Sequence, residues 1–193
     1  MELDPDPFRQ FQQWLQEALA AGGADPHAMS LATATPDGVP SARMVILRDL
    51  DERGLVFYTD FDGQKARELD VNPHAALVFY WAPLERQVRV SGPARRTSRE
   101  ETEAHFRTRP RGARLAAWIR QSRVLASRAA LEQEFGEIER RYAGDVALPP
   151  FWGGYRVRPE IFEFWQGLPD RLHDRVRYTR RSEGQWLQER LTP

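Results

Sequence analysis

Short β-type segments separated by turn signals fill the stretch from residue 29 to residue 92, and they restrict the fold more than any other feature. Each segment is rich in apolar, β-branched and aromatic residues, and the sequences Pro-Asp-Gly at 36–38 and Asp-Glu-Arg-Gly at 51–54 mark turns between them. The pattern predicts a meander of antiparallel strands. The expected strands cover 29–35, 41–50, 55–59, 75–81, 86–92, 154–165 and 175–191, the last with a turn at Glu183-Gly184.

One of these segments, Met-Val-Ile-Leu at 44–47, is apolar at every position. Because neighbouring strand residues point to opposite faces, both faces of this strand are expected to be buried. An open sheet with one wet face would not provide that burial, whereas a closed or nearly closed barrel would. The sequence therefore predicts a mainly β fold, a small barrel with helices around it.

The peripheral helices are indicated by their end signals. Asp6 and Pro7 suit the start of an amphipathic helix that ends at Gly22-Gly23, and Ser98 with Glu101 forms a capping-box pattern for a helix that runs to about Arg109. Further helices are expected over 63–69, 113–120 and from Ser127 to about Tyr142. At 193 residues the chain is the size of one ordinary domain, so residues 1–193 are expected to form a single unit.

Several classes of chemistry are excluded by composition. The chain has no cysteine, which removes disulfides, thiolate catalysis and cysteine-ligated metals. Its four histidines lack metal-ligand spacing, and no glycine-rich nucleotide loop or serine-nucleophile motif is present. No apolar run approaches the ~20 residues of a membrane span, and the N-terminus is acidic rather than signal-like. These features predict a cytoplasmic protein without a metal and without a membrane partner.

The basic residues are unusual in kind and in place. Lys65 is the only lysine among 28 basic residues, and the stretch 86–128 holds 12 arginines against three acidic residues. Such a cluster could bind a nucleic-acid backbone, but no recognised nucleic-acid-binding motif accompanies it. A site for small anionic ligands uses the same arginines equally well, so nucleic acid is the lesser expectation.

The segment Arg-Leu-His-Asp-Arg at 171–175 is a candidate ligand site. If it is extended, Arg171, His173 and Arg175 share one face, which suits an anionic ligand. The aromatic run just before it, at 162–165, could stack on a flat heteroaromatic ring. A solvated edge strand and an ordinary hydrophobic core are the alternative interpretations of these two patterns.

Two further cations stand where an anion could bind. Lys65 lies near the start of a predicted helix, where free backbone N–H groups and the helix dipole attract anions. Arg43 enters the doubly apolar strand and would need an anionic partner there. Taken singly, each could equally be a surface charge.

Nine segments, taken in order, resemble the pyridoxamine 5'-phosphate oxidase family over nearly the whole chain. The order FWGGYRV, EFWQG and RLHDR is the most specific part. The segments are RMVILR (43–48), VFYTD (56–60), GQKAREL (63–69), LERQVRVSG (84–92), RPRGARLAAW (109–118), RQS (120–122), PPFWGGYRV (149–157), EFWQG (163–167) and RLHDR (171–175).

The resemblance implies an FMN-binding split β-barrel that forms a homodimer with FMN at the subunit interface. It places Lys65 and Arg43 at the FMN phosphate. The matching FMN positions are Arg43, Met44, Val45, Ile46, Leu47, Arg48, Tyr58, Thr59, Gln64, Lys65, Gln87, Gln121, Ser122, Trp165 and Arg175.

The implied reaction converts pyridoxamine or pyridoxine 5'-phosphate to pyridoxal 5'-phosphate while O2 is reduced to H2O2. Arg171 and His173 would be the catalytic residues. The matching substrate positions are Arg48, His105, Arg109, Ala113, Arg171, Leu172 and His173.

This chain departs from the family pattern at several of these positions. His105 and Ala113 stand where tyrosine and serine are usual, Gln64 replaces a basic residue, and Arg48 replaces a lysine found in some members. Two alternatives therefore stay open. One is a related split-barrel flavin oxidase acting on another aromatic metabolite, as in phenazine biosynthesis, and the other is a non-catalytic FMN or pyridoxal phosphate binding protein.

Overall fold

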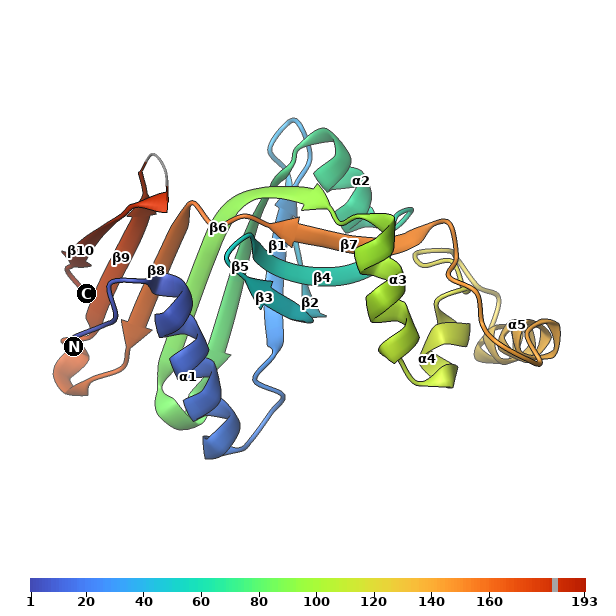
Figure 1. The fold of residues 1–193 in the computed structure, drawn as a ribbon, viewed down its shortest axis with the longest axis horizontal. Helices are drawn as coiled ribbons and strands as arrows, with labels where there is room; N and C mark the ends of the chain where they lie inside the picture. Colours follow the sequence, from blue (N-terminus) through green and yellow to red (C-terminus); the bar gives the residue numbers. More distant parts are fainter. Residues whose placement is uncertain (182–183) are drawn as a thin grey trace.

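The computed structural model describes residues 1–181 and 184–193, and its strands form one antiparallel hydrogen-bonded sheet with helices outside it (Figure 1). The main path of this sheet runs β10-β9-β8-β6-β5-β1-β2. The described strands are β1 (Ala28–Ala34), β2 (Pro40–Ile46), β3 (Asp49–Asp51), β4 (Gly54–Asp60), β5 (His74–Trp81), β6 (Arg86–Arg96), β7 (Trp152–Val157), β8 (Ile161–Gln166), β9 (Asp174–Arg180) and β10 (Trp186–Leu191).

Strand β6 divides the sheet into two parts. One edge of β6 pairs with β5, while the other edge pairs first with β8 and then, from Ala94 to Arg96, with β7. Strand β7 continues to β4, which lies near β2 without a ladder between them in the described residues. The sheet from β2 to β4 therefore curls into a half-barrel that is open between its two ends, and β8 to β10 extend away from it (Figure 1). The predicted mainly β architecture with peripheral helices is confirmed.

The point of division is a close approach between Gly92 and the chain at 158–160. The Arg158 N–H donates to the Pro93 carbonyl and the Glu160 N–H donates to the Ser91 carbonyl, each at 2.8 Å. A Cβ at Gly92 would lie 2.0 Å from the Arg158 carbonyl oxygen, so only glycine fits. The single strand expected over 154–165 is therefore wrong in one respect, because the bend at 158–160 separates β7 from β8.

The strand expected over 41–50 is also two strands. The Leu47 N–H donates to the His27 carbonyl at 2.9 Å, but the next N–H, that of Arg48, donates to Val56 at 2.8 Å. The chain thus changes its partner from the β1 side to β4, and it forms a corner of the half-barrel between β2 and β3.

The expected burial of both faces of 44–47 is wrong within one chain. Met44 is 64% exposed, Val45 and Ile46 are partly exposed, and only Leu47 is buried. The physical reason is position, because β2 ends the sheet path and no layer of the same chain covers its outer face.

The helices match their end signals closely. Helix α1 (Pro7–Ala21) starts at Asp6, whose side chain accepts from the Phe8 N–H, and it packs Phe11 against Phe79 with ring centroids 4.9 Å apart. The capping box at Ser98 is present on α3. The other helices are α2 (Gln64–Val71), α3 (Arg99–Thr108), α4 (Arg111–Ala116) and α5 (Arg128–Arg141), with short 3-10 turns at Ala82–Leu84 and Pro169–Arg171.

Two expected elements have different boundaries in the structure. The helix expected over 113–120 is α4, which starts two residues earlier and ends at Ala116, because residues 117–120 leave the helix as a turn. The strand expected over 175–191 is the pair β9 and β10, as its internal turn signal suggested. Glu183 of that turn lies outside the described residues.

The close approach at Gly92 gives a stability prediction. Gly92→Ala should lower the free energy of unfolding by about 3 kcal/mol, because the new methyl group meets a backbone oxygen that no side-chain rotation can move. Gly136→Ala, in the middle of α5 with only a flexible Arg140 side chain nearby, should instead stabilise by up to about 1 kcal/mol. Urea denaturation at one protein concentration measures both. Equal stabilities for the two variants would contradict the close approach.

Candidate functional site

Lys65 lies at a junction of three segments. It sits in the first turn of α2, and its Nζ donates to Thr59 Oγ1 of β4 at 3.0 Å. Thr59 Oγ1 in turn donates to Gln121 Oε1 at 3.4 Å, and the Gln121 N–H donates to the Asp60 carboxylate at 2.8 Å. The loop after α4 is thereby held against the end of β4 and the start of α2.

The charge of Lys65 is poorly compensated. Burial lowers its pKa, the positive charge of Arg43 lowers it further, and Asp60 only partly opposes this. Within the described residues no carboxylate oxygen lies within 4.0 Å of Nζ. A half-buried ammonium beside a second cation and a helix N-terminus is a place where an anion would be stabilised.

Arg43 is held by a polar cluster from β1, β2 and α2. Its guanidinium donates to the hydroxyls of Thr33 and Ser41 at 2.6 Å each, and it pairs with the Glu68 carboxylate at 3.4 Å. Burial acts to raise the pKa of Glu68, but hydrogen bonds from Ser41, Thr33 and Gln64 and the charge of Arg43 together lower it to about 2. Glu68, which the sequence analysis missed, therefore positions Arg43.

A second cationic group surrounds a stack of three rings. His105 of α3 stacks on Tyr58 of β4 with centroids 4.0 Å apart and planes 7° apart, and Trp152 of β7 lies nearly parallel to both, 5.2 Å from Tyr58 and 6.3 Å from His105 between centroids. The Arg109 guanidinium lies 4.5 Å from the Trp152 ring centroid. We call Tyr58, His105 and Trp152 with Arg48 and Arg109 the ring-stack site.

The positive charge of the ring-stack site is also poorly compensated. Arg109 Nη1 is buried and has no hydrogen-bond partner in the part of the chain that the structure describes. Burial, followed by the charges of Arg109 and Arg48, lowers the pKa of His105 to about 4, so its imidazole is neutral near pH 7. Burial likewise lowers the pKa of Arg109. An anion bound at the ring-stack site would be attracted by the guanidinium groups of Arg109 and Arg48.

A third group lies where β6, β8 and β9 adjoin. In the register of these strands Gln87 is opposite Trp165, and Trp165 is opposite Arg175, so the three residues form one row. His173 lies against Trp165 with ring centroids 4.7 Å apart. Arg175 is paired with the Glu163 carboxylate at 2.9 Å.

The expectation that Arg171, His173 and Arg175 share one strand face is wrong. Strand β9 begins only at Asp174, and Arg171 ends a 3-10 turn with a φ of 60°. His173 reaches Trp165 because its Nδ1 accepts the Leu168 N–H at 3.1 Å. Leu172 points outward and is 70% exposed.

The structure places the Lys65 junction beside the ring-stack site, but the row formed by Gln87, Trp165 and Arg175 lies apart from both. Tyr58 and Thr59 are adjacent on β4, so the ring-stack site and the Lys65 junction are neighbours. The turn that carries Arg171 and His173 lies at the far side of the molecule from α3 and α4 within one chain (Figure 1). Of the remaining predicted positions, Gln64 and Arg48 are exposed, Ala113 is on α4, and Ser122 has a φ of 62° in the loop after it.

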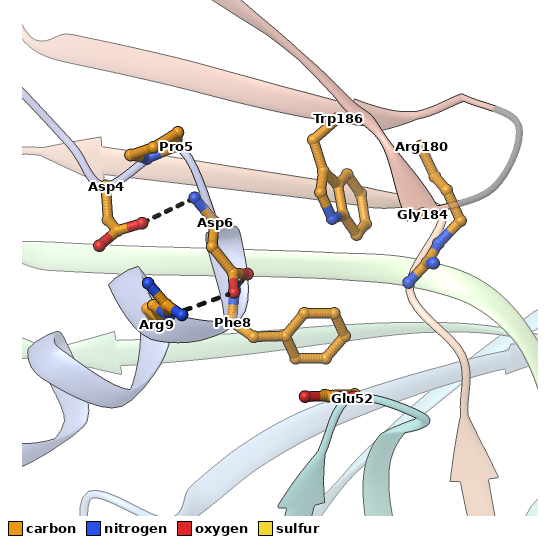
Figure 2. A pocket seen from close by; sticks show the side chains of 9 residues that line it. All are labelled: Asp4, Pro5, Asp6, Phe8, Arg9, Glu52, Arg180, Gly184 and Trp186. Atoms are coloured by element: carbon orange, nitrogen blue, oxygen red, sulfur yellow. Dashed lines mark hydrogen bonds and ion pairs between the residues drawn. The ribbon is translucent and has the colours of Figure 1, made fainter.

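A cavity of about 610 Å³ lies elsewhere, between the N-terminal segment, the β3–β4 turn and the β9–β10 hairpin (Figure 2). Asp6 caps α1 and pairs with Arg9, and Arg180 Nε donates to the Pro159 carbonyl at 2.7 Å, while Arg180 Nη2 is buried without a hydrogen-bond partner in the described residues. None of the sequence-predicted site residues lines it. The candidate site is therefore defined by side-chain chemistry rather than by this cavity.

Trp152 was also missed by the residue-based part of the sequence analysis. It contacts both the Arg109 guanidinium and the Tyr58 ring and belongs to the hydrophobic cluster that includes Phe106 of α3. Its segment, Phe-Trp-Gly-Gly-Tyr, is part of a family motif. The two glycines that follow Trp152 leave room for the side chains of Phe61 and Thr97 to pack against β7.

A half-barrel divided at β6, with two cationic sites beside β4, defines a split-barrel protein of the pyridoxamine 5'-phosphate oxidase type. Among solved structures, PhzG from Burkholderia lata 383, in complex with tetrahydrophenazine-1-carboxylic acid, is 32% identical, covers 98% of this chain and 94% of its own, and has a TM-score of 0.93. A pyridoxamine 5'-phosphate oxidase-related, FMN binding protein from Nostoc punctiforme PCC 73102 is 20% identical over the full length of both chains, with a TM-score of 0.78, and shows the same fold.

The chain belongs to the pyridoxamine 5'-phosphate oxidase family. Residues 15–142 match the model for pyridoxamine 5'-phosphate oxidase, and residues 152–193 match that for the pyridoxine 5'-phosphate oxidase C-terminal dimerisation region. The pyridoxine/pyridoxamine 5'-phosphate oxidase of Rubrobacter xylanophilus is 60% identical over 98% of this chain and 88% of its own. The enzyme of the same name from Trichormus variabilis is 50% identical over 100% of this chain and 91% of its own. The resemblance and the expectation of an oxidoreductase are confirmed. Among the described residues no helix has the length and apolar character to span a membrane.

The neutral state of His105 gives a prediction about pH and stability. Its folded pKa of about 4 lies below the ordinary 6.5, so between these values the unfolded chain binds a proton that the folded chain does not. Lowering the pH from 7 to 5 should therefore reduce the free energy of unfolding more in the wild-type protein than in His105→Gln. Urea denaturation at both pH values measures this difference, and parallel losses would show that His105 is protonated normally in the fold.

Proposed function

We propose that residues 1–193 form one FMN-binding split-barrel domain that oxidises pyridoxamine or pyridoxine 5'-phosphate to pyridoxal 5'-phosphate with reduction of O2 to H2O2. The observation that carries this proposal is the pair of cationic sites beside β4, one at Lys65 of α2 and one at Arg109 at the end of α3, neither with a carboxylate partner in the described residues. Two neighbouring anion sites suit a reaction in which the cofactor and the substrate each carry a phosphate. The names of the relatives at 60% and 50% identity support the same reaction.

The residues at the first site fit the phosphate of FMN. Among the described residues, Lys65 Nζ hydrogen-bonds only to the Thr59 hydroxyl, and Arg43 is held nearby by its ion pair with Glu68. Residues 44–48, Tyr58, Thr59, Gln64, Gln121 and Ser122 would border the rest of the cofactor, with Gln87, Trp165 and Arg175. When bound, FMN supplies the two-electron redox chemistry and the reaction with oxygen.

A complete site requires a second copy of the chain. Strand β8 and the turn before β9, which carry Trp165, Arg171 and His173, lie away from α2 and α3 within one chain (Figure 1), so the proposed site takes these three residues from a partner. The match of residues 152–193 to a dimerisation region supports a homodimer. The exposed apolar face of β2 at Met44 would be covered by the same association.

His173 and Arg171 are proposed to hold the substrate ring. Because His173 Nδ1 accepts the Leu168 N–H, the neutral imidazole carries its proton on Nε2 and presents a hydrogen-bond donor. Arg171, on an exposed turn, adds a positive charge beside it. At the other end Arg48, His105 and Arg109, next to Ala113, would bind the substrate phosphate. The role of the protein is thus orientation and charge complementarity.

A second candidate is oxidation of a different aromatic metabolite. The high structural similarity to PhzG, whose structure contains tetrahydrophenazine-1-carboxylic acid, favours it. His105 and Ala113, in place of the usual hydroxyl-bearing residues, also distinguish this chain at the phosphate end. The number of negative charges on the substrate separates the two candidates.

The reaction can be tested directly. The purified protein should be yellow, and adding pyridoxamine 5'-phosphate should produce pyridoxal 5'-phosphate with consumption of O2 and release of H2O2, followed by absorbance and an oxygen electrode. A yellow protein that oxidises a tetrahydrophenazine carboxylate but neither B6 phosphate would decide for the second candidate. A flavin-loaded protein that oxidises neither compound would be a binding protein.

The two proposed roles can be separated by substitution. Lys65→Ala should weaken FMN binding roughly 10- to 100-fold, the loss of one charge-assisted contact, whereas His173→Ala should mainly lower kcat, by roughly 100-fold. Arg67→Ala is the matched control, because it removes one positive charge from an exposed position on the same helix. Flavin fluorescence titration and steady-state rates measure the two effects. The opposite pattern would mean that the roles are exchanged.

A further inference from the structure

We propose that His105 is a specificity-determining residue that takes up a proton when a phosphate monoester binds, so that the ring-stack site prefers dianions to carboxylates. The inference builds on the proposed function, which places the substrate phosphate at this site. It adds a mechanism of selection between a doubly and a singly charged substrate group.

The position of the imidazole supports this role. Stacking on Tyr58 covers a face of the ring, so its edge, with both nitrogens, remains available. Neither ring nitrogen makes a hydrogen bond among residues 1–181 and 184–193. His105 is therefore held in place by its ring and not by a polar partner, and its two nitrogens can serve a ligand.

Two guanidinium groups lie close enough to His105 for their charges to act on its imidazole. Arg109 stands one turn further along, at the C-terminal end of α3, with Nη1 buried and without a partner in the described chain, and the exposed Arg48 acts on both residues. The neighbouring arginines of α4 point elsewhere, since Arg111 donates to the carbonyls of Tyr142 and Gly144 and Arg114 pairs with Asp145.

The acidic groups around His105 do not balance its two arginines. Asp49 of β3 acts to raise the pKa of the imidazole, but it is exposed and lies 3.9 Å from the Arg156 guanidinium. On the Tyr58 side, Glu101 is already paired with Arg156, which also binds Asp51. Burial raises the pKa of the Tyr58 phenol, so this ring stays neutral. Without a ligand the site thus holds two positive charges and a neutral imidazole.

A bound phosphate dianion changes this balance. Its two negative charges balance the two guanidinium charges that oppose protonation, and its oxygens accept a hydrogen bond from the imidazolium N–H. A carboxylate carries one negative charge and leaves one guanidinium charge uncompensated, so His105 stays neutral beside it. Protonated His105 then adds a third charge-assisted hydrogen bond to a phosphate that a carboxylate does not receive.

The direct test is an NMR titration of the FMN-loaded wild-type protein. The His105 Cε1–H signal, assigned by comparison with His105→Tyr, should give a pKa of about 4 without ligand and above 6 when the protein is saturated with phenyl phosphate. Saturation with benzoate should leave the pKa below 6. A His105 pKa below 6 with phenyl phosphate bound would overturn the inference.

Affinity measurements supply a second readout. His105→Tyr keeps a ring that can stack on Tyr58 but does not become cationic. It should lose about tenfold of the preference for phenyl phosphate over benzoate at pH 6.5, the worth of one charge-assisted hydrogen bond. His74→Tyr, the same replacement at an exposed strand position, should keep the preference. An unchanged preference in His105→Tyr contradicts the inference.

The outcomes also separate this inference from the proposed function. A rise of the His105 pKa with phenyl phosphate, in a protein that oxidises no B6 phosphate, would support the selective site and reject the reaction. Oxidation of pyridoxamine 5'-phosphate without any rise would support the reaction and reject proton uptake by His105.

Discussion

The division of one strand edge between two partners is the constraint on which the rest of the structure depends. Strand β6 offers a single edge to β8 and β7, and the bend at 158–160 against Gly92 lets the two strands diverge. On one side β7 carries the sheet to β4, which holds Tyr58 and Thr59. On the other side β8 carries it to β9 and the Trp165–His173 contact. The groups on β4 and on the turn between β8 and β9 are therefore separated by this one departure from a regular ladder.

The basic residues of the candidate site fall into two groups, those that are paired with a carboxylate and those that are half-buried without one. Arg43 and Arg175 are fixed by carboxylates, Glu68 and Glu163, which hold their positions. Arg109 and Lys65 are half-buried without such a partner in the described residues. Uncompensated charge of this kind destabilises a fold in the absence of a ligand. Lys65 contacts Thr59 of β4, and Arg109 lies over Trp152, which is beside Tyr58 of β4, so an anion bound near this strand would restore the missing interactions.

Membership of the pyridoxamine 5'-phosphate oxidase family explains the architecture, whereas the chemistry at the ring-stack site belongs to this chain. His105 brings a titratable ring to a place where a phenol would stay neutral. Ala113 removes a hydroxyl group from the same neighbourhood.

The sequence by itself determined what local interactions decide. The cap at Asp6, the capping box at Ser98 and the turn signals between strands predicted the helices and most strands, because each depends on residues within a few positions. It also indicated Lys65, Arg43 and the 171–175 segment as candidate ligand sites. Only the tertiary structure decided the breaks at 47–48 and 158–160, the exposure of Met44, and the contacts of Glu68 and Trp152. These depend on partners far away along the chain: a residue cannot signal locally that its next hydrogen bond goes to a different strand, or that its strand ends the sheet. The physical reason is that strand pairing and burial are non-local, while caps and turns are not.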